Sequence, residues 1–145
     1  APVGRMNLQS VGRDAAAPSS GAIELRHSGA MDTSELAVVT TTAADIDWLT
    51  GFARTLVAEE VIACANILPA IRAVYRWEGE VTEDVEALAV LHTTTAALDR
   101  LQERIATEHP YAVPQVVVLR ADAAAGYLNW VRGAVAVTPG PAAAK

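Results

Sequence analysis

The chain has 145 residues, of which just over half are apolar, and a formal net charge of −6 at neutral pH. This length suits one domain with a hydrophobic core, and no stretch reaches the ~20 apolar residues that a membrane-spanning helix needs. The acidic balance argues against a nucleic-acid partner, because such binding depends on lysine and arginine neutralising phosphates. The single cysteine excludes an internal disulfide and fits a reducing compartment, which predicts a soluble, cytoplasmic protein.

Composition divides the chain into one domain and two flanking segments. Residues 1–33 are rich in Ala, Gly, Ser and Arg without sustained periodicity, which predicts a flexible extension. Residues 138–145 contain Pro and Gly and are expected to form a flexible tail. The folded domain is therefore expected to span residues 34–137. Met31 leaves open a natural start there, with the preceding residues as an added leader or a transit segment.

The domain is expected to begin with a strand and a helix. β-branched residues predict a strand over residues 36–41. Asp45 can then cap a helix that reaches about residue 60, because apolar residues recur at helical spacing from Ile46 to Val57.

A long hairpin is expected next. Residues 65–77 and 83–93 alternate with a period of two, and Glu78-Gly79-Glu80 supplies the turn. The alternation places Ile67, Ile71, Ala73, Tyr75 and Trp77 on one face. Pro69 cannot donate a ladder hydrogen bond, which predicts a bulge or an edge position there.

The last expected elements are two helices separated by a buried strand. Thr94 or Thr95 is expected to cap a helix that ends at His109-Pro110-Tyr111. A strand over residues 115–119 and a helix capped by Asp122 follow. The order β-α-β-β-α-β-α predicts an α+β, ferredoxin-like split-βαβ fold with an extra C-terminal helix, in which two helices cover one sheet face. The bare face and the overhanging hairpin predict association with further copies of the chain.

Several short motifs occur in a fixed order within this domain. They are Val39-Thr40-Thr41-Thr42, Ala63-Cys64-Ala65-Asn66-Ile67-Leu68-Pro69, Tyr75-Arg76-Trp77-Glu78-Gly79, Glu86, His109-Pro110-Tyr111 with Pro114, and Tyr127-Leu128-Asn129-Trp130. In this order and spacing the set resembles the CutA family, the divalent-cation-tolerance proteins, over about residues 36–133. The resemblance implies a compact, stable homotrimer that takes part in the response to metal ions, and some members of the family bind copper. One departure is His92-Thr93, where members commonly carry a Lys-Thr pair.

Candidate metal ligands are Cys64, His92 and His109, since copper favours thiolate and imidazole donors. They are scattered along the chain, and no local His pair presents two donors together. The alternative is that Cys64 is a small buried residue and that His109 ends a helix and hydrogen-bonds to backbone. No cofactor is expected to be obligatory; copper or another divalent cation is the candidate ligand.

A second group of residues is expected at an inter-subunit cleft or interface, where large aromatic side chains bury much area. Its members are Asn66, Tyr75, Trp77, Glu86, Tyr111, Pro114 and Trp130. Glu86 is expected to pair with Arg72 or Arg76, either across the hairpin or across a subunit boundary. The other carboxylates near Gly79 are interpreted as a solvated hairpin tip.

The chain lacks a Gly-rich phosphate loop, a G-x-S-x-G elbow and an H-E-x-x-H motif, so an enzymatic activity is not expected. The resemblance to the CutA family implies a homotrimeric divalent-cation-tolerance protein. The alternative is a PII-like signalling module that binds a small anionic ligand in an inter-subunit cleft through Arg72, Arg76 and His92.

Overall fold

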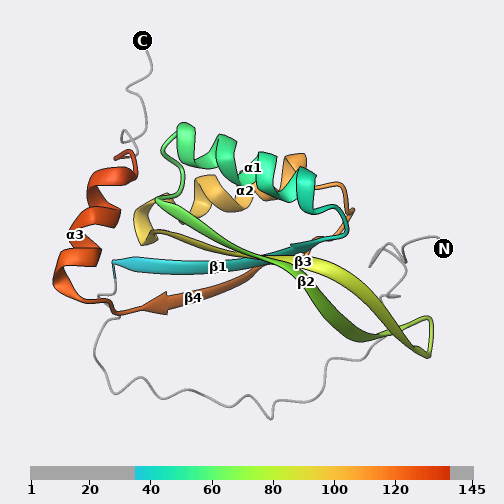
Figure 1. Cartoon of the computed structure of the whole chain (residues 1–145). Helices are drawn as coiled ribbons and strands as arrows, with labels where there is room; N and C mark the ends of the chain where they lie inside the picture. Colours follow the sequence, from blue (N-terminus) through green and yellow to red (C-terminus); the bar gives the residue numbers. More distant parts are fainter. Residues whose placement is uncertain (1–34, 138–145) are drawn as a thin grey trace.

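The computed structural model describes residues 35–137, which form a four-stranded antiparallel sheet with three helices (Figure 1). The elements in chain order are β1 (Leu36–Ala43), α1 (Ile46–Ala58), β2 (Cys64–Trp77), β3 (Glu80–Thr94), a short 3-10 helix (Thr95–Ala97), α2 (Leu98–Glu108), β4 (Val117–Ala121) and α3 (Ala125–Ala134). This order of strands and helices is the predicted one. The predictions for residues 1–33 and 138–145 lie outside the described residues. None of the helices within residues 35–137 has the length and apolar character needed to cross a membrane.

The strands lie in the order β2-β3-β1-β4, so β2 and β4 form the two edges of the sheet. Helices α1 and α2 lie side by side over one face, while α3 stands at one end of β1 and β4 (Figure 1). The distal part of the β2–β3 hairpin extends beyond the region that the helices cover. Within residues 35–137, one sheet face and most of the hairpin are therefore left without a covering layer.

One of the three predicted helix caps is confirmed. The Asp45 carboxylate accepts the backbone N–H groups of Asp47 and Trp48 at 2.8 and 3.2 Å, which satisfies donors that the first helical turn leaves free. The caps predicted at Thr94 or Thr95 and at Asp122 are wrong, because no side chain caps the 3-10 helix, α2 or α3. The chain enters α2 through the 3-10 turn instead.

The hairpin turns at Glu78 and Gly79, whose φ angles are 48° and 81°. Two successive positive φ angles match the twist of a tight hairpin, and glycine adopts such a conformation without a steric penalty. The prediction for Pro69 is confirmed on both counts, since β2 is an edge strand and its register with β3 shifts between Leu68 and Ile71.

That shift corrects one sequence prediction. A bulge adds one residue to β2 and inverts its alternation, so Ile67 and Ile71 face opposite sides of the sheet instead of sharing a face. Beyond the bulge, Ile71 is paired with Glu86 and Tyr75 with Thr82. These residues therefore point to the face that the helices leave uncovered.

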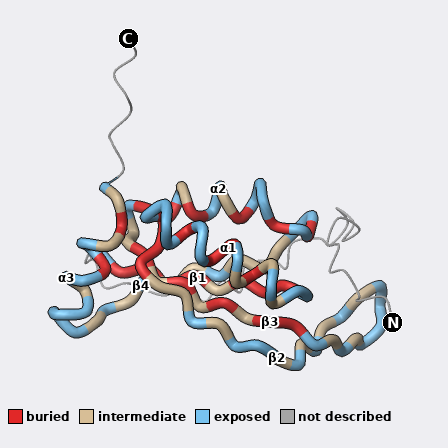
Figure 2. The backbone as a smooth tube through the Cα atoms, turned by 45° about the horizontal axis from the view of Figure 1, so that its top comes forward, coloured by how far each residue is buried: buried red, intermediate tan, exposed pale blue. Residues whose placement is uncertain are grey.

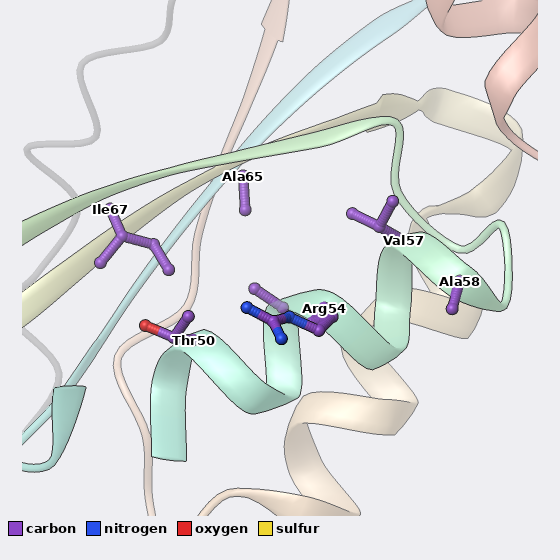
Figure 3. A pocket seen from close by; sticks show the side chains of 7 residues that line it. Thr50, Arg54, Val57, Ala58, Ala65 and Ile67 are labelled. Carbon is purple, nitrogen blue, oxygen red and sulfur yellow. The ribbon is translucent and has the colours of Figure 1, made fainter. Parts of the chain in front are cut away.

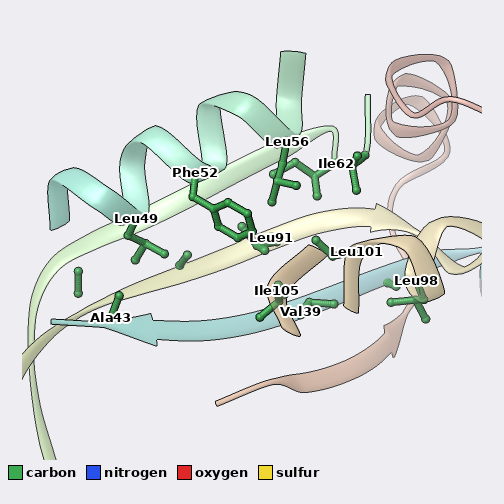
Figure 4. Packing of buried hydrophobic residues seen from close by; sticks show 14 residues of the cluster. Val39, Ala43, Leu49, Phe52, Leu56, Ile62, Leu91, Leu98, Leu101 and Ile105 are labelled. Atoms are coloured by element: carbon green, nitrogen blue, oxygen red, sulfur yellow. The ribbon is translucent and has the colours of Figure 1, made fainter. Parts of the chain in front are cut away.

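The core lies between the two helices and the covered face of the sheet (Figure 4). Leu49, Phe52 and Leu56 of α1 pack there beside Leu101 and Ile105 of α2. Many of the sheet side chains beneath them are small, because alanines lie among the valine and leucine residues of β1 and β3. These alanines are Ala37, Ala43, Ala87 and Ala89. Buried residues concentrate along β1 and β3, whereas the far part of the hairpin is exposed or half-buried (Figure 2).

The uncovered face carries apolar side chains that water reaches. Leu68, Val117 and Leu119 are 43%, 44% and 54% exposed. The register places Leu119 opposite Val38 on this face, in the same row of the sheet as His92 and Cys64. An apolar sheet face of this kind is typical of a contact surface for another molecule.

Candidate functional site

Two of the predicted metal ligands meet on the uncovered face. Cys64 opens β2 and His92 lies near the end of β3, and the two are direct partners in the antiparallel register. Their side chains therefore point to the same side. The Cys64 Sγ atom lies 4.0 Å from His92 Nδ1. Residues separated widely in sequence are brought together here by strand pairing alone.

Helix α3 adds Tyr127 to this pair. The Tyr127 hydroxyl and His92 Nδ1 share a hydrogen bond of 2.6 Å, and the two rings meet edge to face at 5.8 Å. Burial, followed by a hydrogen bond with Cys64, raises the pKa of the Tyr127 hydroxyl. A small second core that includes Leu36 and Val131 holds α3 in place. The sequence places Tyr127 within a family motif, of which only Trp130 is predicted to be a site residue.

A thiolate and a neutral imidazole are the donors that copper and zinc accept most readily. Bond lengths of about 2.3 Å to sulfur and 2.0 Å to nitrogen, at a tetrahedral angle, separate the two donors by roughly 3.5 Å. The observed 4.0 Å is within a small side-chain movement of that value. Within residues 35–137 no three His, Cys, Asp or Glu side chains converge, so the pair leaves coordination positions for water or for a donor from another molecule.

His109 lies elsewhere, beyond the C-terminal end of α2. Its Nε2 atom lies 2.8 Å from the carbonyl oxygen of Thr42, and its Nδ1 atom accepts the backbone N–H of Tyr111 at 3.0 Å. Both ring nitrogens are thus occupied by backbone, as in the alternative interpretation of this residue. The three predicted ligands therefore separate into the Cys64–His92 pair and a structural histidine.

The buried His109 ring predicts a dependence of stability on pH. Burial lowers the pKa of His109 below its ordinary value of 6.5, although the hydrogen bond to Thr42 opposes this effect. As pH falls through that value, the unfolded chain takes up a proton that the folded chain does not. The free energy of unfolding should therefore fall below about pH 6.5 and be unaffected by this group above it.

Thermal unfolding of the wild type and of His109→Gln, measured from about pH 7.5 to about pH 5, checks this prediction. Glutamine retains an N–H that can donate to Thr42 but does not titrate, so the variant should lose less stability on acidification than the wild type. Parallel curves for the wild type and His109→Gln would contradict the prediction.

A second polar cluster lies at the base of the free hairpin. The Glu86 side chain, on β3, is only 4% exposed, and the Tyr111 hydroxyl donates to its Oε2 atom at 3.4 Å. Burial and the neighbouring Glu86 carboxylate raise the pKa of Tyr111 to about 12. Tyr75 donates to Asp84, and this hydrogen bond, followed by burial, raises the pKa of Tyr75 to about 12. Both phenols are therefore hydrogen-bond donors at physiological pH.

The expected pairing of Glu86 with an arginine does not form within the described chain. Arg72 instead lies 3.8 Å from Glu83, with both side chains largely exposed, and Arg76 donates to the carbonyl oxygen of Gly79. The bulge explains this difference, because it places Arg72 and Arg76 on the side of the ribbon opposite to Glu86. Pairing across a subunit boundary stays a prediction.

The residues predicted to share one cleft form two groups. Trp130 is exposed on α3, and its ring centroid lies 5.6 Å from that of Tyr127. Because Tyr127 is hydrogen-bonded to His92, Trp130 lies near the Cys64–His92 pair. Glu86, with Tyr75 and Tyr111 around it, lies about 20 Å further along β3. Three further predicted interface residues are exposed or half-buried: Asn66, Trp77 and Pro114.

An apolar groove of about 420 Å³ runs between α1 and the free edge of β2 (Figure 3). Figure 3 shows side chains from both elements facing the groove, among them Val57 of α1 and Ile67 of β2. Arg54 is the one charged residue along it. The groove adjoins a strand edge whose backbone groups have no neighbouring strand within residues 35–137.

An antiparallel sheet with helices on one face, an apolar second face and a cysteine–histidine pair defines the class of this protein as a small α+β protein. The profile of the CutA1 divalent ion tolerance proteins matches residues 37–134. The chain therefore belongs to the CutA1 family.

Relatives of this chain carry names of the same kind. It is 47% identical over 81 residues to the divalent-cation tolerance protein CutA of Thermus thermophilus, which covers 55% of this chain and 79% of that protein. It is 38% identical over 81 residues to Protein CutA 1, chloroplastic, of Oryza sativa, which covers 55% of this chain. The chain spans only 46% of the rice protein's length.

Solved structures agree in fold. The divalent cation tolerance protein Cut A1 from Thermus thermophilus superposes with a TM-score of 0.66 at 40% identity, covering 70% of this chain and 99% of that one. A PII-like protein CutA from Nostoc superposes with a TM-score of 0.65 at 28% identity, covering 70% of this chain and 99% of that one. The four-stranded sheet with three helices is thus common to this chain and to the solved CutA proteins.

Proposed function

We propose that this protein is a non-enzymatic, ferredoxin-like homotrimer that binds copper or a related divalent cation and takes part in the cytoplasmic response to metal ions. The observation that carries the metal assignment is the Cys64–His92 pair, with Sγ and Nδ1 4.0 Å apart on an accessible sheet face. Family membership supports the role in cation tolerance. His92 is central, because imidazole binds copper whereas the ammonium group of the lysine commonly found in the family has no lone pair while protonated.

The trimeric assembly rests on surfaces that one chain leaves uncovered. The two free edges within residues 35–137 belong to different strands, so a contact between the β2 edge of one copy and the β4 edge of the next is head-to-tail. Contacts of this kind form closed rings when the rotation between copies closes. Such a ring would bury the apolar sheet face and the groove beside β2 together. Light scattering on the purified protein tests the proposal, and a monomer at micromolar concentration would overturn it.

Copper affinity tests the metal assignment. Titration with Cu(I) under anaerobic conditions, against a chromophoric chelator, should show one ion bound per chain. Cys64→Ser should weaken binding at least about 100-fold because it removes the thiolate, and His92→Gln at least about 10-fold because it removes the imidazole. The stoichiometry should be measured per chain in the assembled protein.

His109→Gln is the matched control for this titration, because both nitrogens of His109 already bind backbone. Its copper affinity should equal that of the wild type. The assignment is lost if the wild type takes up no copper at micromolar concentration. It is equally lost if His109→Gln weakens binding as much as His92→Gln does.

The PII-like alternative draws on the name of the Nostoc neighbour. Within one chain, however, Arg72 and Arg76 lie in the distal hairpin, roughly 23 and 36 Å from His92 along the strands. These three cations could hold one anion only if different copies contribute them. A screen of nucleotides and carboxylates by thermal shift tests this function, and unchanged melting temperatures across the screen would remove it.

A further inference from the structure

Glu86 is a buried carboxylate that no cation within residues 35–137 contacts. Its side chain is 4% exposed, and among residues 35–137 its one hydrogen bond is the long contact of 3.4 Å from the Tyr111 hydroxyl. Carboxylates are rarely buried unless a positive group or several hydrogen bonds compensate for the lost hydration. Residues 35–137 by themselves therefore leave the environment of Glu86 incomplete.

A second polar group on the same face also lacks a partner. Among residues 35–137 the buried Thr42 hydroxyl has no hydrogen-bond partner, and the register pairs Thr42 with Leu88, one step along the uncovered face from Glu86. The loop after α2 covers both residues, since His109 bonds to the Thr42 carbonyl and Tyr111 bonds to Glu86. Within residues 35–137 the structure thus buries a carboxylate with one long hydrogen bond close to a hydroxyl with none.

A cation cannot reach Glu86 from its own hairpin. Arg72 and Arg76 lie on the opposite side of the ribbon and contact Glu83 and the Gly79 carbonyl there. The remaining acid nearby, Asp84, accepts from Tyr75 and adds a second negative charge on the Glu86 side. The local charge is therefore negative, and residues 35–137 supply no compensating group for Glu86.

We propose that Glu86, together with Tyr111 and the Thr42 hydroxyl, binds a guanidinium or ammonium group supplied from outside the chain. A hard metal ion needs about six oxygen ligands, whereas no three acidic, His or Cys side chains converge within residues 35–137. A guanidinium or ammonium ion instead needs one carboxylate, further hydrogen-bond acceptors and an aromatic wall. Glu86, the Thr42 hydroxyl and the Tyr111 ring supply these. This site is separate from the Cys64–His92 pair and does not rest on copper binding.

An arginine of a second copy and a free organic amine would both supply this cation. The experiment distinguishes these two sources. Agmatine, which carries a guanidinium and an ammonium group, is the probe for the free ligand, and its binding is measured by calorimetry. Sedimentation over a dilution series measures self-association. Glu86→Gln keeps the shape of the side chain and removes its charge, and circular dichroism shows whether the variant is folded.

Glu83→Gln is the matched control, since Glu83 lies on the same hairpin but is exposed and faces the other side. If the ligand is free, the wild type and Glu83→Gln bind agmatine, and Glu86→Gln binds it at least about 10-fold more weakly. If a second copy supplies the arginine, Glu86→Gln raises the concentration at which the assembly dissociates by a similar factor. Tyr111→Phe should likewise weaken agmatine binding if the ligand is free, or raise the concentration at which the assembly dissociates if a second copy supplies the arginine. A Glu86→Gln protein that is folded and matches Glu83→Gln in both measurements would overturn the proposal.

Discussion

Leu119→Glu should convert the assembled protein into monomers. Leu119 is 54% exposed on edge strand β4 and stands opposite Val38 on the uncovered face. In a trimer closed through this face its side chain would be buried between copies. A glutamate there would bury a charge without a partner in each of three equivalent contacts, at a cost of several kcal/mol per contact. Light scattering coupled to size-exclusion chromatography, at micromolar concentration, measures the change in mass.

Ala106→Glu is the control for this experiment, because Ala106 is exposed on α2, away from the uncovered face. It adds the same charge and should leave the mass unchanged. Both variants should keep the far-ultraviolet circular dichroism of the wild type. If Leu119→Glu retains the mass of the wild type, the uncovered face is not the surface through which the chain assembles.

The second large effect concerns the packing of α1. Leu56 is fully buried in the core, and its truncation to alanine leaves a cavity that close-packed neighbours fill only in part. Leu56→Ala should therefore lower the free energy of unfolding by about 2–5 kcal/mol. Urea unfolding should be compared in the Leu119→Glu background, where unfolding no longer depends on the concentration of copies.

Val57→Ala is the matched control, since the adjacent residue is 42% exposed and faces the groove beside β2. In the monomeric background it should lower the free energy of unfolding by less than about 1 kcal/mol. Equal losses for the two variants would contradict the orientation of α1 described above. A Leu56→Ala protein as stable as its parent would contradict the burial of Leu56 in the hydrophobic core.

Local patterns predicted those features that depend on neighbouring residues. Asp45 could be identified as a cap because its partners lie two and three residues further along the chain. Pro69 predicted both the bulge and the edge strand, because proline has no backbone N–H to donate to the regular hydrogen-bond ladder of a central strand. The turn at Gly79 followed from the conformational freedom of glycine. The order of elements, and hence the α+β class, follows from such local signals.

Predictions that needed a count of residues across the bulge were wrong. The alternation of β2 put Ile67 and Ile71 on one face, whereas one inserted residue places them on opposite faces. The same inversion separates Arg72 and Arg76 from Glu86, the carboxylate they were expected to neutralise. A period of two carries no information about where an extra residue enters, so one residue reverses every later assignment.

By itself the sequence determined the element types, their order, the candidate donors and the family resemblance. Only the tertiary structure decided which donors meet. Register placed Cys64 beside His92, α3 brought Tyr127 to them, and the loop after α2 engaged both nitrogens of His109 with backbone. The physical reason is that helix periodicity and turn chemistry act over a few residues, whereas a binding site depends on side chains that strand pairing and packing bring together from distant parts of the chain.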